Sequence, residues 1–281
     1  MNIRERFFNQ VVHDIQHKRL VLPSLPELAL RVRQMVEDTG VSVAAIAKVV
    51  SMDAAMSSRL IEVANSAFYR GKTPVEDVRA AIARVGNNTV RNLVTALLLK
   101  QMYLVKSSPV VRKHLQALQQ HNIEVAAYSQ VLAHKFTSLK PDVAMLGGLV
   151  HRIGALPLLV YADSIPEIVG DEASLMAVVE QMHRAVGRLI LEAWNFPESL
   201  VLVVTEYEDL QRKGGAQPDY VDVVQVASLH TYLGTDHPWA EVQWDTVPAF
   251  AKLGLTTPKE HMEMMRQASD EVSQVKALLS A

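Results

Sequence analysis

The chain has 281 residues, long enough for one large domain or two of ordinary size around a continuous core. Apolar residues make up 49% and aromatic residues 6%, a balance that favours helices and excludes a collagen-like or all-β protein. The 28 basic and 30 acidic residues give a net charge of -2, so the chain as a whole creates no electrostatic demand for nucleic acid or an anionic membrane. With no cysteine there are no disulfides, thiolate zinc sites or cysteine nucleophiles, and we expect a cytoplasmic protein.

The two parts of the chain carry opposite charges. Residues 1–108 contain 15 Lys and Arg against 9 Asp and Glu, whereas residues 109–281 contain 13 against 21. Opposite net charges suggest two lobes that attract each other, although salt screens exposed charges beyond roughly 8 to 10 Å.

Apolar residues recur at helical spacing in nearly every segment of the first part. Ser42 and Asp53 are cap residues that each precede one such stripe, and Asn88 begins a longer stripe that ends near Ser108. We therefore predict an N-terminal helical lobe over residues 1–108.

The second part opens with a helical pattern of more than seven turns, which runs from Val110 towards Phe136. Further helices are expected up to Leu233, and together they form a second lobe over residues 109–235. Residues 236–281 are predicted as an extension, irregular at first, that ends in a helix from Lys259. The predicted fold is all-α with two lobes.

The most apolar long stretch runs from Val143 to Ala162 and is nominally long enough to span a bilayer. His151 and Arg152 interrupt it, and its glycines and Pro157 break its regularity. We interpret it as buried helices around a polar pocket, and we expect no membrane association.

Residues 43–66 have the spacing of a helix-turn-helix. The second helix offers Arg59 as its one base, whereas binding in a DNA groove depends on several phosphate contacts. Two packed helices are therefore favoured, and nucleic acid is not expected as a partner.

His13 and His17 lie one helical turn apart, a spacing that two metal ligands can have. The segment is terminal, lacks a third ligand nearby and is surrounded by charged residues, so a solvated helix face is favoured.

Three histidines, His121, His151 and His183, stand in apolar helical segments, where each imidazole needs a hydrogen-bond partner. One such residue alone is usually a satisfied core histidine. Together with Arg152, they indicate one shared polar cavity.

Several motifs between residues 20 and 235 occur as a set: Leu22-Pro23-Ser24-Leu25-Pro26, Asp53 with Arg59-Leu60, Ala64-Asn65-Ser66-Ala67-Phe68-Tyr69, Val85-Gly86, Gly147-Gly148-Leu149-Val150-His151, Ile153-Gly154, His183 with Gly187, and Trp194-Asn195-Phe196-Pro197. The set resembles the HDOD family, an output domain of bacterial signalling proteins that is related to HD-type metal phosphohydrolases. The resemblance implies an N-terminal helical bundle packed on an HD-domain/phosphodiesterase-like helical lobe.

The resemblance also implies a degenerate metal site. Catalytic HD enzymes hold a divalent metal with an early His, a His-Asp pair and a later Asp. His121 and His151 match the two histidines, but Arg152 and Ser228 stand where the two acids belong. A cation in place of an anion replaces attraction by repulsion, each about 4 kcal/mol at about 4 Å. We predict no metal, no cofactor and no catalytic residue.

The remaining residues define what we call the vestigial HD pocket: His121, His151, Arg152, His183, Glu206 and Ser228. We expect Arg152 to pair with Glu206, or with Glu124 or Glu180, as a charge that organises the pocket in place of a metal. The alternative is that Arg152 and the histidines bind an anion such as a nucleotide phosphate. The ion pair is favoured.

The resemblance implies a non-catalytic signal-transduction module, an adaptor that contacts other signalling proteins. Phe68, Tyr69 and Arg70 are the candidate exposed contact, with packing between the lobes as the alternative. Two other functions stay open: a residual metal-dependent phosphohydrolase acting on nucleotides or cyclic dinucleotides, and a nucleic-acid-binding regulator that uses the basic first lobe.

Overall fold

The computed structural model describes residues 2–38, 40–66 and 68–280, and in the last helix the side chains of residues 260, 263 and 266–280. These residues are 71% helical and form no strand, so the predicted all-α fold is confirmed. The helices are stabilised because the apolar stripe of each one is buried against neighbouring helices.

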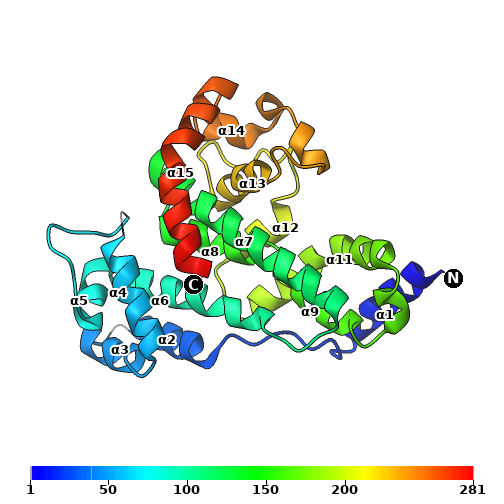
Figure 1. Cartoon of the computed structure of the whole chain (residues 1–281), viewed down its shortest axis with the longest axis horizontal. Coiled ribbons are helices and arrows are strands. Elements are labelled where there is room, and N and C mark those ends of the chain that lie inside the picture. The colour runs from blue at the N-terminus through cyan, green and yellow to red at the C-terminus, as the bar shows by residue number, and fades with distance from the viewer. Residues whose placement is uncertain (1, 39, 67, 281) are drawn as a thin grey trace.

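The first lobe is built from short helices at one end of the molecule (Figure 1). In chain order they are α2 (Glu27–Glu37), α3 (Val43–Val50), α4 (Ala54–Asn65), α5 (Val78–Val85) and α6 (Asn87–Leu99), followed by the 3-10 turn η1 (Lys100–Tyr103). The predicted caps are present, since the Ser42 hydroxyl accepts from the Ala45 N–H at 3.2 Å and the Asp53 carboxylate from the Met56 N–H at 2.9 Å.

The second lobe surrounds one long helix. The helices are α7 (Pro109–Phe136), α8 (Pro141–Val150), α9 (Ala155–Ala162), α10 (Pro166–Val169), α11 (Glu172–Ala193), α12 (Glu198–Glu206) and α13 (Tyr220–Thr231). α8, α9 and α13 all pack on α7, which therefore forms the spine of this lobe (Figure 1).

Two glycines bring the pocket-forming helices together. A Cβ on Gly148 would lie 2.5 Å from the Cα of Ala126, so α8 crosses α7 more closely than any larger residue permits. A Cβ on Gly154 would lie 1.9 Å from the carbonyl oxygen of His183, so the turn after α8 packs directly on α11. Residues 151–153 are thereby held between α7 and α11.

The helix α1 (Ile3–Gln16) does not lie with the lobe predicted over residues 1–108. It packs on α10 and α11 of the second lobe (Figure 1), with Phe7 stacked on Tyr161 at a ring distance of 6.2 Å. The chain then runs back to α2 without helix, and Trp194 donates to the carbonyl of Pro23 at 3.0 Å. α1 therefore packs on helices of the second lobe, although its residues fall within the range predicted for the first lobe.

The extension consists of the 3-10 turns η2 (Pro238–Glu241) and η3 (Trp244–Thr246) and the helices α14 (Pro248–Lys252) and α15 (Pro258–Ser280). Its irregular part is ordered by aromatic contacts, such as Trp244 stacked on Phe250 at 5.3 Å. α15 then returns along α7, and its end lies near α4 (Figure 1).

One stretch in the described residues, Pro141–Ala162, has the length and composition of a membrane span. It comprises α8, the turn after it and α9, and 83% of its most apolar window is buried inside the protein. The prediction of buried helices is confirmed for this stretch.

Candidate functional site

Two histidines face each other at the centre of the pocket. His121 comes from α7 and His151 follows α8, and their Nε2 atoms are 3.3 Å apart. His151 is fully buried, and its Nδ1 donates to the carbonyl of Gly148 at 2.7 Å. The lone pair of neutral His151 therefore lies on Nε2, where it accepts from the Nε2–H of His121.

Both imidazoles are neutral at ordinary pH. Burial, reinforced by the Arg152 guanidinium and by His237, lowers the pKa of His121 to about 3. Burial also holds the pKa of His151 well below its usual value, and the nearby His121 and Arg152 act in the same direction. The pair is thus a neutral hydrogen-bonded unit.

Arg152 lies beside this pair and interacts with three other side chains. It forms an ion pair with Glu180, approaches Glu208 at 3.9 Å and donates to the Tyr207 hydroxyl at 3.3 Å. Burial alone would lower the pKa of Arg152, but Tyr207 and Glu180 outweigh that effect and raise it, so the guanidinium stays charged. The predicted organising ion pair is present, with Glu180 as one partner.

Glu206 does not join the pocket. Its carboxylate accepts a hydrogen bond from Arg212 at 2.6 Å, and Arg212 also donates to Asp219. α12 ends at Glu206, and the turn that follows directs Glu208 inward instead. Glu208 was not predicted from the sequence, because a helix boundary decides which of two carboxylates two residues apart faces the core.

Glu124, the other predicted partner of Arg152, is also engaged elsewhere. Its carboxylate pairs with Lys276 of α15 at 2.5 Å. Glu180, the predicted partner that does pair with Arg152, lies three residues before His183 on the same face of α11, and their side chains approach to 3.9 Å.

His183 is fully buried, and its Nε2 donates to Glu208 at 2.9 Å. Burial would raise the pKa of Glu208, but the bond from His183, the Tyr207 hydroxyl and Arg152 together lower it to about 2. Glu208 is therefore ionised and holds Arg152 and His183 together.

Ser228 is buried in α13, but its hydroxyl has no hydrogen-bond partner among the described residues. The neighbouring Thr231 hydroxyl donates to the Ser228 carbonyl at 2.8 Å and lies 3.5 Å from His121 Nδ1. Ser228 thus stands near the histidine pair through Thr231 and contributes no charge to it.

A divalent metal of the kind that HD enzymes use does not fit these residues. Glu180, His183 and Glu208 place one ligand atom each within 4.8 Å of one another. The carboxylates are already neutralised, because Arg152 pairs with Glu180 and Arg184 lies 3.2 Å from Glu208. Two guanidinium groups beside two carboxylates leave no net negative charge to retain a hydrolytic cation.

The pocket opens into a cavity of 240 Å³ that His121, Arg152 and Tyr232 share with apolar side chains of α7, α9 and α11. Tyr232 stacks on His237 at a ring distance of 3.7 Å, so the start of the extension closes one side. Neither residue was singled out from the sequence: Tyr232 lies at the end of a predicted helix, and His237 lies in the predicted irregular segment.

In the candidate contact at residues 68–70, Phe68 and Tyr69 are half-buried against the rest of the protein. Phe68 meets His134 of α7 edge-on at 5.4 Å, and the Tyr69 hydroxyl accepts from Gln130 at 3.5 Å. Arg70 is exposed. Packing between the lobes, the alternative to an exposed contact, therefore accounts for Phe68 and Tyr69.

The helix-turn-helix pattern and the N-terminal histidine pair both have structural roles. Residues 43–66 form the packed helices α3 and α4, and Arg59 donates to the carbonyl of Leu278 at 3.0 Å. His13 and His17 stack at 4.1 Å, and His17 Nδ1 donates to the His13 carbonyl at 2.8 Å.

The two-lobed helical fold and the paired histidines define a protein of the HD-like helical class. The family model of the HDOD domain matches residues 22–210, two thirds of the chain. The chain belongs to the HDOD family.

Solved structures with this fold cover nearly the whole chain. A protein from Shewanella amazonensis SB2B, provisionally described as a metal-dependent phosphohydrolase, is 26% identical with a TM-score of 0.84 over 99% of this chain and 100% of its own. An HDOD domain protein of unknown function from Geobacter sulfurreducens is 17% identical, with a TM-score of 0.67 over 99% and 98% of the two chains.

Two further relatives are longer than this chain. A provisionally assigned signal transduction protein from Marinobacter aquaeolei VT8 is 19% identical, with a TM-score of 0.60 over 100% of this chain and 67% of its own. An uncharacterised protein of Treponema pallidum (strain Nichols) is 21% identical over 234 residues, 79% of this chain. The chain spans 44% of the length of that curated relative.

Proposed function

We propose that the chain is a non-catalytic signal-transduction module of the bacterial cytoplasm, which acts through contacts with other signalling proteins. The observation that carries this proposal is Arg152. Its guanidinium stands beside the histidine pair, where the resemblance to HD enzymes implies a carboxylate, and is bound by Glu180 and approached by Glu208. Membership of the HDOD family and the signalling assignment of the Marinobacter relative support the role.

Metal content and hydrolysis test the proposal together. The protein is purified without chelators, its metals are quantified by inductively coupled plasma analysis, and nucleotides and cyclic dinucleotides are offered with Mn²⁺, Mg²⁺, Fe²⁺ or Ni²⁺. We expect substoichiometric metal and no turnover above the buffer. Stoichiometric metal together with turnover would establish an enzyme and overturn the proposal.

The competing function is a metal-dependent phosphohydrolase, and one comparison favours it. The Shewanella protein provisionally described as such an enzyme is 26% identical over 99% of this chain. The same assays decide between the two functions, because an adaptor predicts no turnover with any of the metals.

We also propose that Arg152 is structural and does not receive an anionic ligand. Its charge is already balanced by Glu180 and Glu208, so a phosphate entering the cavity would meet two carboxylates as well as the guanidinium. Thermal shift with phosphate and with cyclic dinucleotides is the test. We expect an unchanged melting temperature, and a saturable increase would show that the pocket binds an anion.

A further inference from the structure

The last helix, α15, is amphipathic and packs its apolar face against the rest of the chain. Its buried side chains repeat at the spacing of one helix face: Ala268, Val272, Val275 and Leu279. Ser273 and Gln274, between them in sequence, are exposed. Over residues 266–280, where all side chains are described, the contact is therefore made by one narrow stripe.

Both lobes contribute to the groove that receives this stripe. The last turns of α15 share a small gap with side chains from α4, from the segment after it and from α6, α7 and α8: Val63, Phe68, Tyr69, Leu97, Gln130 and Met145. If α15 left, these mostly apolar groups would form an exposed patch, the kind of surface that marks a protein interaction site.

Charged residues at the rim fix the direction of the bound helix. Lys135 of α7 pairs with Glu271 at 2.7 Å, and five residues further along α15 Lys276 pairs with Glu124 of α7 at 2.5 Å. The four side chains are between 27% and 38% exposed, so each pair selects a matching helix while contributing modestly to its retention.

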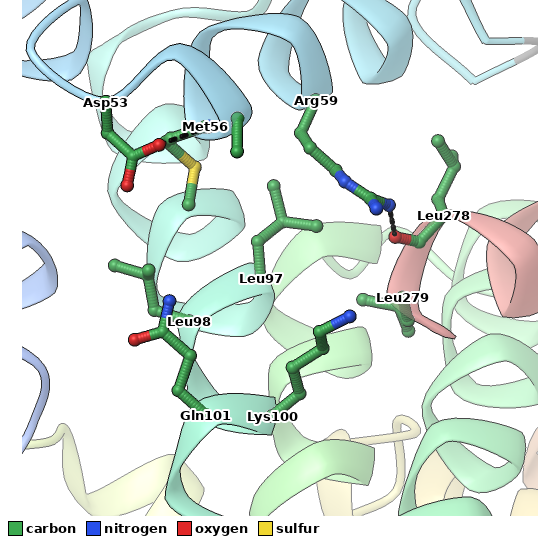
Figure 2. Close-up of a pocket in the computed structure, with 10 residues that line it drawn as sticks. Asp53, Met56, Arg59, Leu97, Leu98, Lys100, Gln101, Leu278 and Leu279 are labelled. Carbon is green, nitrogen blue, oxygen red and sulfur yellow. Dashed lines mark hydrogen bonds between the residues drawn. The ribbon is translucent and has the colours of Figure 1, made fainter. Parts of the chain in front are cut away.

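Two bases of the first lobe hold the end of the helix. Arg59 donates to the carbonyl of Leu278 at 3.0 Å, as Figure 2 shows, and Lys100 donates to the carbonyl of Ser280 at 3.1 Å. Carbonyls in the last turn of a helix lack partners within the helix, and positive charge is favourable there. Any helix that ends at this place would meet the same two donors.

α15 does not fill the groove completely. A cavity of 120 Å³ remains beside Leu278 and Leu279; Leu97, Leu98 and Met56 form its apolar side, and Asp53, Arg59, Lys100 and Gln101 its polar side (Figure 2). A helix with a bulkier apolar side chain at the position of Leu279 would fill this space and gain contact.

We propose that this groove is a helix-binding site, that α15 occupies it within the chain, and that an amphipathic helix of a partner protein replaces α15. The partner helix carries apolar residues at the spacing of the α15 stripe, an acidic residue opposite Lys135 and a basic residue opposite Glu124. The idea that a partner helix binds here rests on the proposed signalling role. Whether the groove can bind a helix is measured by peptide binding, which does not depend on metal content or hydrolysis.

The test uses the full chain with its own helix weakened. In one variant Val272→Asp and Val275→Asp place charges in the buried stripe, and the matched control carries Ser273→Asp and Gln274→Asp on the exposed face. A fluorescent peptide of residues 258–280 is titrated against each protein by anisotropy, and circular dichroism checks the fold. A second peptide carries Leu279→Phe.

We expect the peptide to bind the stripe variant at least tenfold more tightly than the wild type or the control, and the Leu279→Phe peptide to bind severalfold more tightly still. Should the stripe variant not fold, Arg59→Ala with Lys100→Ala weakens the helix end without touching the core, and a smaller gain in binding is expected. No binding to any folded variant, or equal binding to wild type and variant, would overturn the proposal.

Discussion

Arg152 lies between two acidic side chains and beside two neutral imidazoles, and removing it would leave Glu180 and Glu208 without their shared cation. We expect Arg152→Met to lower the free energy of unfolding by about 2 kcal/mol, less than for a fully buried pair because Glu180 is half exposed. Urea denaturation measures the change. Arg188→Met is the control, since the pair of Arg188 with Glu192 is exposed and its loss should leave the free energy of unfolding nearly unchanged.

The same position provides a test of why the pocket excludes metal. Arg152→Asp removes the guanidinium and places a carboxylate beside His121 and His151, next to Glu180, which has then lost its ion pair, and near Glu208. We expect this variant to bind Mn²⁺ or Zn²⁺ in calorimetry and to gain thermal stability with either ion, whereas Arg152→Met does not. An Arg152→Asp protein that ignores both ions would show that more than the guanidinium excludes the metal.

The buried histidines make stability depend on pH. The pKa of His121 is about 3 in the folded protein, against an ordinary value of 6.5, so below pH 6.5 the unfolded chain binds a proton that the folded chain does not. Stability is therefore full above pH 6.5 and falls as the pH is lowered, by about 1.4 kcal/mol per pH unit for this residue. His121→Gln should flatten urea-derived stability between pH 6.5 and pH 5, and the exposed His17→Gln should not.

Among the helices, close crossings at glycine bring the pocket together. Gly154→Ala would place a Cβ 1.9 Å from the His183 carbonyl, and the neighbouring backbone of α11 cannot move away as a flexible side chain would. We expect a loss of about 3 kcal/mol or more in the free energy of unfolding. The matched control is Gly170→Ala, where the nearest atom is 3.4 Å away and we expect a change within about 0.5 kcal/mol.

At the scale of the whole molecule, the N-terminal helix α1 packs on α10 and α11, which lie more than 140 residues further along the chain. Phe7 is 2% exposed and stacks on Tyr161, whose hydroxyl donates to Asp14 at 2.5 Å. Phe7→Ala should cost about 3 kcal/mol locally and release α1 from α10 and α11. Hydrogen exchange should then rise in α1 and stay unchanged in α4, and equal exchange in both helices would show global unfolding instead.

Local patterns in the sequence determined the helices, their caps and the presence of a polar pocket. Helical spacing and cap residues act within a few positions, so the starts after Ser42 and Asp53 and the buried stretch around His151 follow without knowledge of the fold. His121 and His151 were paired through the family resemblance, and they do lie together.

Only the tertiary structure decided which distant groups meet. Glu208 rather than Glu206 faces Arg152, α1 packs on the second lobe, Phe68 packs against α7, and α15 lies in a groove between the lobes. Each outcome depends on the angle at which one helix ends or crosses another, a property that many residues far apart in sequence set together. Spacing along the chain shows that a face is apolar or charged, but not which other face covers it.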